Sequence, residues 1–140
     1  MHILMIGCGR SGRHLAELLL QAGLELVLID EDPAHLATLD DLNAVQIQGH
    51  PIDIEILEKA GIQDAAAVIA LDDRENINIM CCQIAHKLYG IQHVIARTFT
   101  PENENFVHSL GLSTICSTNL TVNRALSTLG FKDGFEGENE

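Results

Sequence analysis

The chain has 140 residues, of which 46% are hydrophobic, and its formal net charge at pH 7 is −12. This length predicts one folded α/β domain and leaves no room for a second, catalytic domain. The acidic charge argues against binding to nucleic acid or to an anionic membrane surface, since both need clustered Lys and Arg. The apolar runs have the length of strands, far below the ~20 residues of a membrane-spanning helix, and no leader segment is recognisable. We therefore expect a cytoplasmic protein without direct membrane insertion.

The first 30 residues predict a strand, a glycine turn, a helix and a second strand. Residues 2–6 form an apolar run typical of a buried parallel strand, and residues 24–29 form another. Between them, a helix predicted over residues 11–22 follows a G-x-G-x-x-G motif made of Gly7, Cys8, Gly9, Arg10, Ser11 and Gly12. In this motif the first glycine permits a tight turn, the second lets the backbone approach a pyrophosphate, and the third lets the helix pack on the strand. The phosphate is expected at the positive end of the helix.

Asp30 ends the second strand, where a carboxylate is placed to accept hydrogen bonds from ribose hydroxyls and to repel a 2′-phosphate. The predicted ligand is therefore an adenine nucleotide with a free ribose (ATP, ADP, AMP or NAD(H)) and not NADP. Alternatively, Asp30 only caps the next helix, whose first turn contains Pro33. Arg10 is placed to pair with a terminal phosphate, the alternative being a solvated surface arginine. Cys8 lies at a helix N-terminus, where thiolates are favoured, so a redox-sensing role is a further hypothesis.

The rest of the chain alternates between helix and strand. Predicted helices cover residues 33–42, 53–60, 72–90, 101–110 and 117–129, and predicted strands cover residues 44–48, 65–71, 91–96 and 112–116. Short right-handed crossovers then predict an α/β fold, a Rossmann-like doubly wound parallel six-stranded sheet with helices on both faces. The alternating strand 44–48 is expected near an edge and the fully apolar strand 65–71 near the centre. We expect a nucleotide-binding domain over residues 1–130 and a disordered acidic tail over residues 131–140.

The cysteines and histidines show no spacing typical of metal ligands, so we expect no metal site built from them. Asp72, Asp73 and Glu75 open the predicted helix 72–90, where acidic side chains suit the helix dipole. Beside a nucleotide phosphate, the same three carboxylates make a Mg²⁺ ion possible.

An ordered set of motifs resembles the TrkA-N family, also called the N-terminal domain of regulators of potassium conductance (RCK). The motifs are G-C-G-R-S-G, V-L-I-D-E-D-P, a G-x-x-x-D-x-x-x-L-x-x-A-G-I run from Gly49, A-L-D-D-R-E-N-I-N and V-I-A-R, within residues 3–126. The resemblance implies a non-enzymatic, nucleotide-sensing regulatory subunit of a membrane potassium channel or transporter. It also implies a homo-oligomer, in which dimers build a tetrameric or octameric ring at the inner face of the cell membrane.

By position, the resemblance places Gly7, Gly9 and Gly12 on the polyphosphate, Arg10 on its terminal charge and Asp30 on the ribose. The family usually has an Asp directly after the glycine corresponding to Gly49, whereas this chain has His50 and Pro51, so adenine contacts are expected through backbone groups. Residues at the carboxyl ends of the strands border the ligand crevice of such a sheet. In this chain they are Glu31, Leu71, Asp72, Asp73, Asn76 and Arg97. Arg97 is expected to contact phosphate or to hold the contact between subunits.

Two enzymatic functions compete with this interpretation. A small NAD-dependent oxidoreductase is the main alternative, but Tyr89 has His93 four residues on instead of the lysine of a Y-x-x-x-K pair. An ATPase is the other, but the G-x-x-x-x-G-K-[ST] phosphate loop is absent and no lysine lies near the glycines. We therefore expect no catalytic residues. The chain is expected to be a minimal regulator, part of a longer protein, or one component of a two-chain assembly.

Overall fold

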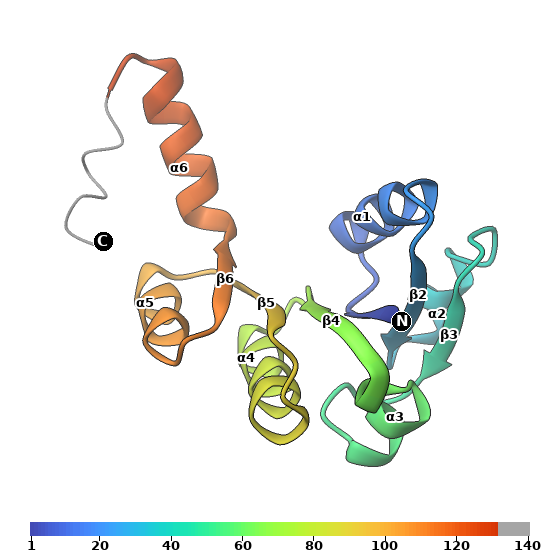
Figure 1. The fold of residues 1–140 in the computed structure, drawn as a ribbon. Coiled ribbons are helices and arrows are strands. Elements are labelled where there is room, and N and C mark those ends of the chain that lie inside the picture. Colours follow the sequence, from blue (N-terminus) through green and yellow to red (C-terminus); the bar gives the residue numbers. More distant parts are fainter. Residues whose placement is uncertain (132–140) are drawn as a thin grey trace.

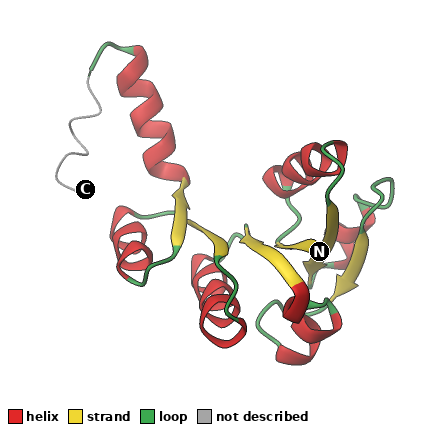
Figure 2. Ribbon diagram, in the orientation of Figure 1, coloured by secondary structure: helices red, strands yellow, loops and turns green. Residues whose placement is uncertain are grey.

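Six parallel strands form one sheet in the order β3-β2-β1-β4-β5-β6, flanked by helices on both faces (Figures 1 and 2). The structure is a computed structural model, and it describes residues 1–131. The strands are β1 (His2–Ile6), β2 (Glu25–Asp30), β3 (Val45–Gln48), β4 (Ala65–Ala70), β5 (His93–Thr98) and β6 (Ser113–Cys116). The helices are α1 (Arg10–Gln21), α2 (Pro33–Ala37), α3 (Ile54–Lys59), α4 (Glu75–Gln83), α5 (Pro101–Ser109) and α6 (Ser117–Thr128), with a 3₁₀ turn at Ile62–Asp64 and a π-helical turn at Ile84–Leu88.

The hydrophobic pattern of each strand explains its place in the sheet. β1 and β4 lie at the centre, where both faces are covered, and their sequences HILMI and AAAVIA are almost wholly apolar. β3 has the sequence VQIQ and lies at the edge, with only Ile47 buried. The predicted edge and central strands are thus confirmed. So is the predicted fold, a Rossmann-like six-stranded parallel sheet with helices on both faces.

Successive residues of the central strands point to opposite faces of the sheet and build two separate cores. On one face, Met5 and Ile69 pack in a cluster with residues of α1 and α2. On the other face, Leu4, Ile6 and Val68 pack with residues of α3, α4 and α5. This arrangement leaves the carboxyl ends of β1, β2 and β4 at one edge of the layered structure, between the two helical layers.

Two predicted helices begin or end elsewhere. α2 ends at Ala37 instead of residue 42, and the Thr38 hydroxyl donates to His35 O (2.6 Å) where the chain turns. The helix predicted from residue 72 begins at Glu75, because the Arg74 N–H group donates to the carboxylate of Asp72 (2.9 Å) and holds a turn there. Asp72 and Asp73 therefore precede the helix and do not belong to its first turn. Acidic residues are typical of the first turn of a helix. The sequence pattern therefore predicts a helix start at Asp72, three residues before the observed start.

The fifth strand was predicted at residues 91–96 and lies at His93–Thr98, so Arg97 is within the strand instead of beyond its end. α6 extends away from the sheet after β6, as Figure 1 shows, and none of its residues is buried. Within residues 1–131, every helix is too short or too polar to cross a membrane. The tail predicted to be disordered falls almost wholly on residues 132–140, which lie outside the described residues.

Candidate functional site

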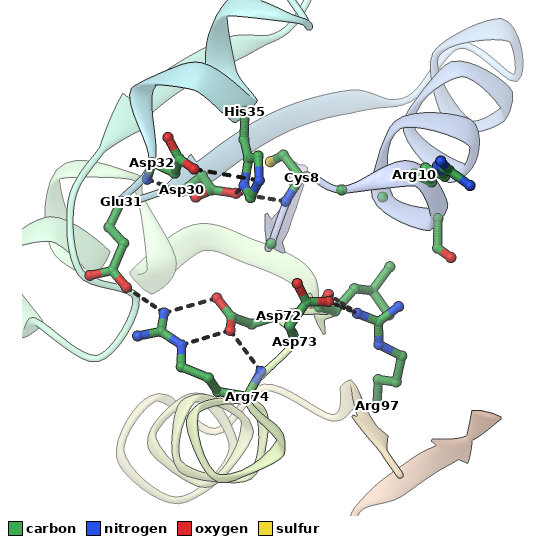
Figure 3. Close-up of a pocket in the computed structure, with 15 residues that line it drawn as sticks. Cys8, Arg10, Asp30, Glu31, Asp32, His35, Asp72, Asp73, Arg74 and Arg97 are labelled. Atoms are coloured by element: carbon green, nitrogen blue, oxygen red, sulfur yellow. Dashed lines mark hydrogen bonds and ion pairs between the residues drawn. The ribbon is translucent and has the colours of Figure 1, made fainter. Parts of the chain in front are cut away.

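A cavity of about 600 Å³ opens at the carboxyl ends of β1, β2 and β4 (Figure 3). This is the edge at which open α/β sheets bind ligands, at the point where the strand order reverses around β1. The residues that line the cavity come from the glycine loop and the start of α1, the end of β2, the start of α2, the loop after β4, and β5. They are Gly7, Cys8, Gly9, Arg10, Ser11, Gly12, Asp30, Glu31, Asp32, His35, Leu71, Asp72, Asp73, Arg74 and Arg97.

Two glycines of the loop are required by its geometry. Gly7 has a φ of +85°, a region that favours glycine, and a Cβ on it would lie 2.5 Å from Asp72 N. A Cβ on Gly12 would lie 2.5 Å from Gly7 O, so α1 comes this close to the strand only because residue 12 is glycine. The first glycine therefore makes the tight turn and the third allows the helix to pack.

Gly9 differs, because a Cβ on it would meet no atom of residues 1–131 within 4 Å. The space beside it belongs to the cavity. α1 begins directly after Gly9, and in the described part of the chain no side chain caps its first N–H groups. Uncapped N–H groups at the positive end of a helix favour an anion. The space and the free donors fit the phosphates of a nucleotide.

Arg10 is exposed at the rim of this loop. Within residues 1–131 its side chain has neither an ion pair nor a hydrogen bond, in contrast to the other two arginines of the cavity. Its guanidinium group is therefore available to a ligand.

Asp30 is buried, with a side chain only 6% exposed, and binds three neighbouring groups. Its Oδ2 accepts from Cys8 N (2.9 Å) and lies 3.0 Å from His35 Nδ1, while its Oδ1 accepts from Asp32 N (2.8 Å). The helix cap is Asp32, whose side chain accepts from Ala34 N (2.9 Å). The alternative that Asp30 caps α2 is thus wrong. Asp30 instead fixes the glycine loop to the end of β2 and keeps acceptor capacity on Oδ1 for a ligand.

Cys8 does not have the environment of a reactive thiol. Burial, together with the nearby Asp30 carboxylate, raises the pKa of Cys8 to about 12, and its Sγ lies 3.9 Å from Ile29 O. Reactive cysteines have a lowered pKa and solvent access. The structure therefore argues against the redox-sensing hypothesis, because the loop buries the thiol against the sheet.

Arg74 lines the cavity from the loop that follows β4. It forms a bidentate pair with Asp72 (Nε–Oδ1 2.9 Å, Nη2–Oδ2 3.1 Å) and an ion pair with Glu31. Burial alone would raise the pKa of Asp72, but the hydrogen bonds from the Arg74 side chain and backbone outweigh it and hold that pKa below its usual value. Asp72 thus stays charged.

Arg97 and Asn78 connect the loop after β4 to β5. Arg97 Nη2 donates to Leu71 O (2.6 Å) and to Asp73 Oδ1 (3.3 Å), and its Nε is buried without a hydrogen bond in the described part of the chain. Asn78 is fully buried. It accepts from Asp72 N (2.8 Å) and donates to Asp72 O (2.8 Å) and Arg97 O (3.0 Å). These bonds fix the floor of the cavity.

The cavity brings together twelve of the fifteen residues predicted from the sequence. His50, Pro51 and Asn76 do not line it. His50 accepts from Ile52 N (3.3 Å) in its own turn and its Nε2 lies 4.0 Å from Glu31 Oε2, Pro51 is buried, and Asn76 is exposed on the first turn of α4. The part that each predicted residue plays in ligand binding stays a prediction.

Sequence reasoning missed the cavity residues Asp32, His35 and Arg74, and also the buried Asn78. Of these four residues, only Asn78 could have been found from the sequence, because it is a polar residue among the apolar positions of α4. Over residues 1–131, no group of three or more His, Cys, Asp or Glu side chains is arranged to hold a metal ion.

Comparison with known proteins identifies the family. The model of the TrkA-N domain matches residues 3–118. This chain belongs to the TrkA-N family. The Trk system potassium uptake protein TrkA of Streptomyces coelicolor is 32% identical over 130 residues, which are 92% of this chain and 58% of that protein. The chain thus spans little more than half the length of this relative.

Solved structures share the fold at lower identity. The TrkA-N domain of the Escherichia coli inner membrane protein ybaL superposes with a TM-score of 0.83 at 21% identity, over 91% of this chain and 96% of that one. The Kef CTD of Shewanella denitrificans in its AMP-bound form gives 0.77 at 23% identity, over 99% and 87%. The GsuK channel bound to NAD gives 0.72 at 21% identity, over 89% and 23%. At these identities the comparisons establish the fold of the TrkA-N chain.

Proposed function

We propose that this TrkA-N chain is the nucleotide-sensing part of a regulator of a membrane potassium channel or transporter. It binds an adenine nucleotide (ATP, ADP, AMP or NAD(H)) in the cavity at the ends of β1, β2 and β4. The observation that carries the proposal is the open space at Gly9, beside the uncapped start of α1, with the Asp30 carboxylate nearby. This arrangement offers a phosphate site and a ribose site in the order in which a nucleotide presents them.

The relatives support the identity of the ligand and of the partner. The similar Trk proteins are potassium uptake proteins, and structures of the same fold are bound to AMP and NAD. Any Mg²⁺ ion would come with the nucleotide phosphates, since the described residues do not form a metal site by themselves.

The bound nucleotide regulates the partner through a ring of cytoplasmic domains. A ligand shifts such an equilibrium only through different affinities for the two ring states. The homo-oligomer, a dimer that builds a tetrameric or octameric ring, would use exposed apolar surface such as Leu120 and Val122 of α6 and Leu129 directly after it. The ring would be cytoplasmic and would reach the inner face of the membrane through its partner.

The proposal excludes catalysis, and turnover tests this directly. The purified chain is expected to oxidise no NADH and to hydrolyse no ATP above the rate of a protein-free blank. The reason is that, among residues 1–131, neither a lysine for phosphoryl transfer nor a tyrosine–lysine pair lines the cavity. Steady turnover that scales with protein concentration would support the oxidoreductase or the ATPase instead.

Arg10→Ala is expected to weaken ATP binding by about 1.5–3 kcal/mol, the value of a hydrogen bond to a charged group, and to weaken AMP binding much less. The reason is that Arg10 is exposed at the rim of the loop and has no partner in the described chain. Titration calorimetry with both nucleotides measures the two losses. Arg124→Ala on α6 is the control. Equal losses for ATP and AMP would show that Arg10 does not read the terminal phosphate.

The His35–Asp30 contact predicts a dependence on pH. The hydrogen bond to Asp30 raises the pKa of His35, although partial burial opposes it, and the Asp30 and Asp32 charges add to the rise. The pKa of His35 is higher in the folded chain than in the unfolded chain. The contribution of His35 to folding stability is therefore complete below its unfolded pKa and is lost as the pH rises through its folded pKa. Protonated His35 also offsets the charge of Asp30 through its contact with Oδ2, which weakens the hydrogen bond that Oδ1 accepts from a ribose.

Between about pH 6 and pH 8, AMP affinity is therefore expected to rise severalfold more in the wild-type chain than in His35→Gln. The use of the same ligand for both proteins removes the titration of the AMP phosphate from the comparison. Parallel pH profiles for the two proteins would show that His35 does not weaken the hydrogen bond between Asp30 and a ribose.

A further inference from the structure

Arg74 bridges the two sides of the cavity. Its guanidinium contacts both Asp72 oxygens, at 2.9 and 3.1 Å, and also Glu31. Glu31 directly follows β2 and Asp72 follows β4, and these two strands lie on either side of β1 in the sheet. The contacts therefore hold the guanidinium at the crevice between the loops that follow β2 and β4.

The bridge and Arg10 lie on opposite sides of the view in Figure 3. Asp30, Glu31 and Arg74 lie together on the side away from Arg10, with Asp30 above the cavity and Arg74 below it. In the proposed function, which this inference deepens, the phosphates lie at the glycine loop and the ribose lies at Asp30. The base of a nucleotide is attached to the ribose on the side opposite the 5′-phosphate. It therefore extends toward Glu31 and Arg74.

The way in which Arg74 is held leaves it free to contact an aromatic ring. Asp72 and Glu31 contact nitrogen atoms at the edge of the guanidinium, and the side chain is 44% exposed. Within residues 1–131 no aromatic ring is stacked on it. A planar guanidinium stacks well on aromatic rings. Because the carboxylates already fix its orientation, little conformational entropy is lost when a ring stacks on it.

We propose that the nucleotide base stacks on the guanidinium of Arg74, which Asp72 and Glu31 hold in position. Arg74 is then the base-binding residue of the cavity. It approaches the base from the β4 side of the crevice. The stacking contact is made to any ligand that carries an adenine, whether AMP, ATP or NAD(H).

The test compares a ligand with a base and one without. Arg74→Lys keeps the positive charge but removes the planar group, so AMP affinity is expected to fall about tenfold, while affinity for ribose 5-phosphate stays the same. No loss for AMP, or equal losses for both ligands, would overturn the role of Arg74. A wild-type chain that binds neither AMP nor any other adenine nucleotide would instead remove the proposed function.

A matched control and a second measurement keep the test independent of folding. Arg13→Lys removes a similar bidentate pair, with Asp41 at 3.0 and 2.7 Å, from a residue that does not line the cavity, and both affinities should stay unchanged. In the wild-type chain, the NMR signal of the Arg74 Nε–H group, assigned by its loss in Arg74→Lys, should shift with AMP and not with ribose 5-phosphate. A signal that AMP does not move would contradict the stacking.

Discussion

Gly7→Ala is expected to lower the free energy of unfolding by about 2–5 kcal/mol, the sum of a left-handed backbone strain and an overpacked contact. Residue 7 has a φ of +85°, and the added methyl group would lie 2.5 Å from Asp72 N and 2.6 Å from Leu71 C. Both are backbone atoms, so neither moves without shifting the loop after β4. Urea denaturation, followed by circular dichroism, measures the loss.

Gly9→Ala is the matched control for Gly7→Ala. Its φ of −74° suits alanine, and the methyl group would meet no atom of residues 1–131 within 4 Å. Stability is therefore expected to stay within about 0.5 kcal/mol of the wild type. Because the methyl group enters the proposed phosphate space, nucleotide affinity should nevertheless fall. Equal stability losses at both glycines would contradict the geometry of the loop.

Asp30→Ala is expected to affect stability and binding together. It removes the acceptor of the Cys8 and Asp32 N–H groups, of which the first is buried, and a buried donor left unpaired costs about 1–3 kcal/mol. The free energy of unfolding should fall by about 2–4 kcal/mol. AMP affinity should fall by a further 1–3 kcal/mol, roughly 5- to 150-fold, because the ribose hydroxyls lose their carboxylate.

Asp53→Ala separates these two effects. The Asp53 side chain caps α3 by accepting from Glu55 N (2.9 Å), and it does not line the cavity. This variant should lose about 1 kcal/mol of stability and no AMP affinity. If Asp30→Ala binds AMP as tightly as the wild type once both proteins are shown to be folded, Asp30 does not contact the ribose.

The fold follows closely from local patterns in the sequence. The all-apolar run of β4 and the alternating run of β3 place these strands at the centre and the edge, because burial on both faces or on one selects different residues. The glycine motif likewise predicts the turn at Gly7 and the close packing at Gly12, since each requirement acts within a few residues. Strand and helix ends were less predictable. Helix α4, for example, starts late because Asp72 binds the backbone of Arg74.

The cavity was harder to predict, because its missing members depend on contacts between distant segments. His35 lines it because only two residues separate α2 from β2, so that the His35 side chain returns to Asp30. Arg74 lines it because Glu31, in the loop after β2, pairs with it. Conversely, the family resemblance placed His50 and Pro51 near the base, yet neither lines the cavity, and His50 accepts from Ile52 N in its own turn.

Titration calorimetry of the purified chain with AMP, ADP, ATP, NAD and NADH, with and without Mg²⁺, tests the central claim most directly. At least one of these adenine nucleotides is expected to bind one site per chain, and Gly9→Ala is expected to weaken it without loss of stability. Different affinities for ATP and ADP would identify a sensor of energy charge, and stronger binding of NAD and NADH a sensor of redox state. If none of the five binds to the folded wild-type chain, the cavity is not a nucleotide site and the proposed function is wrong.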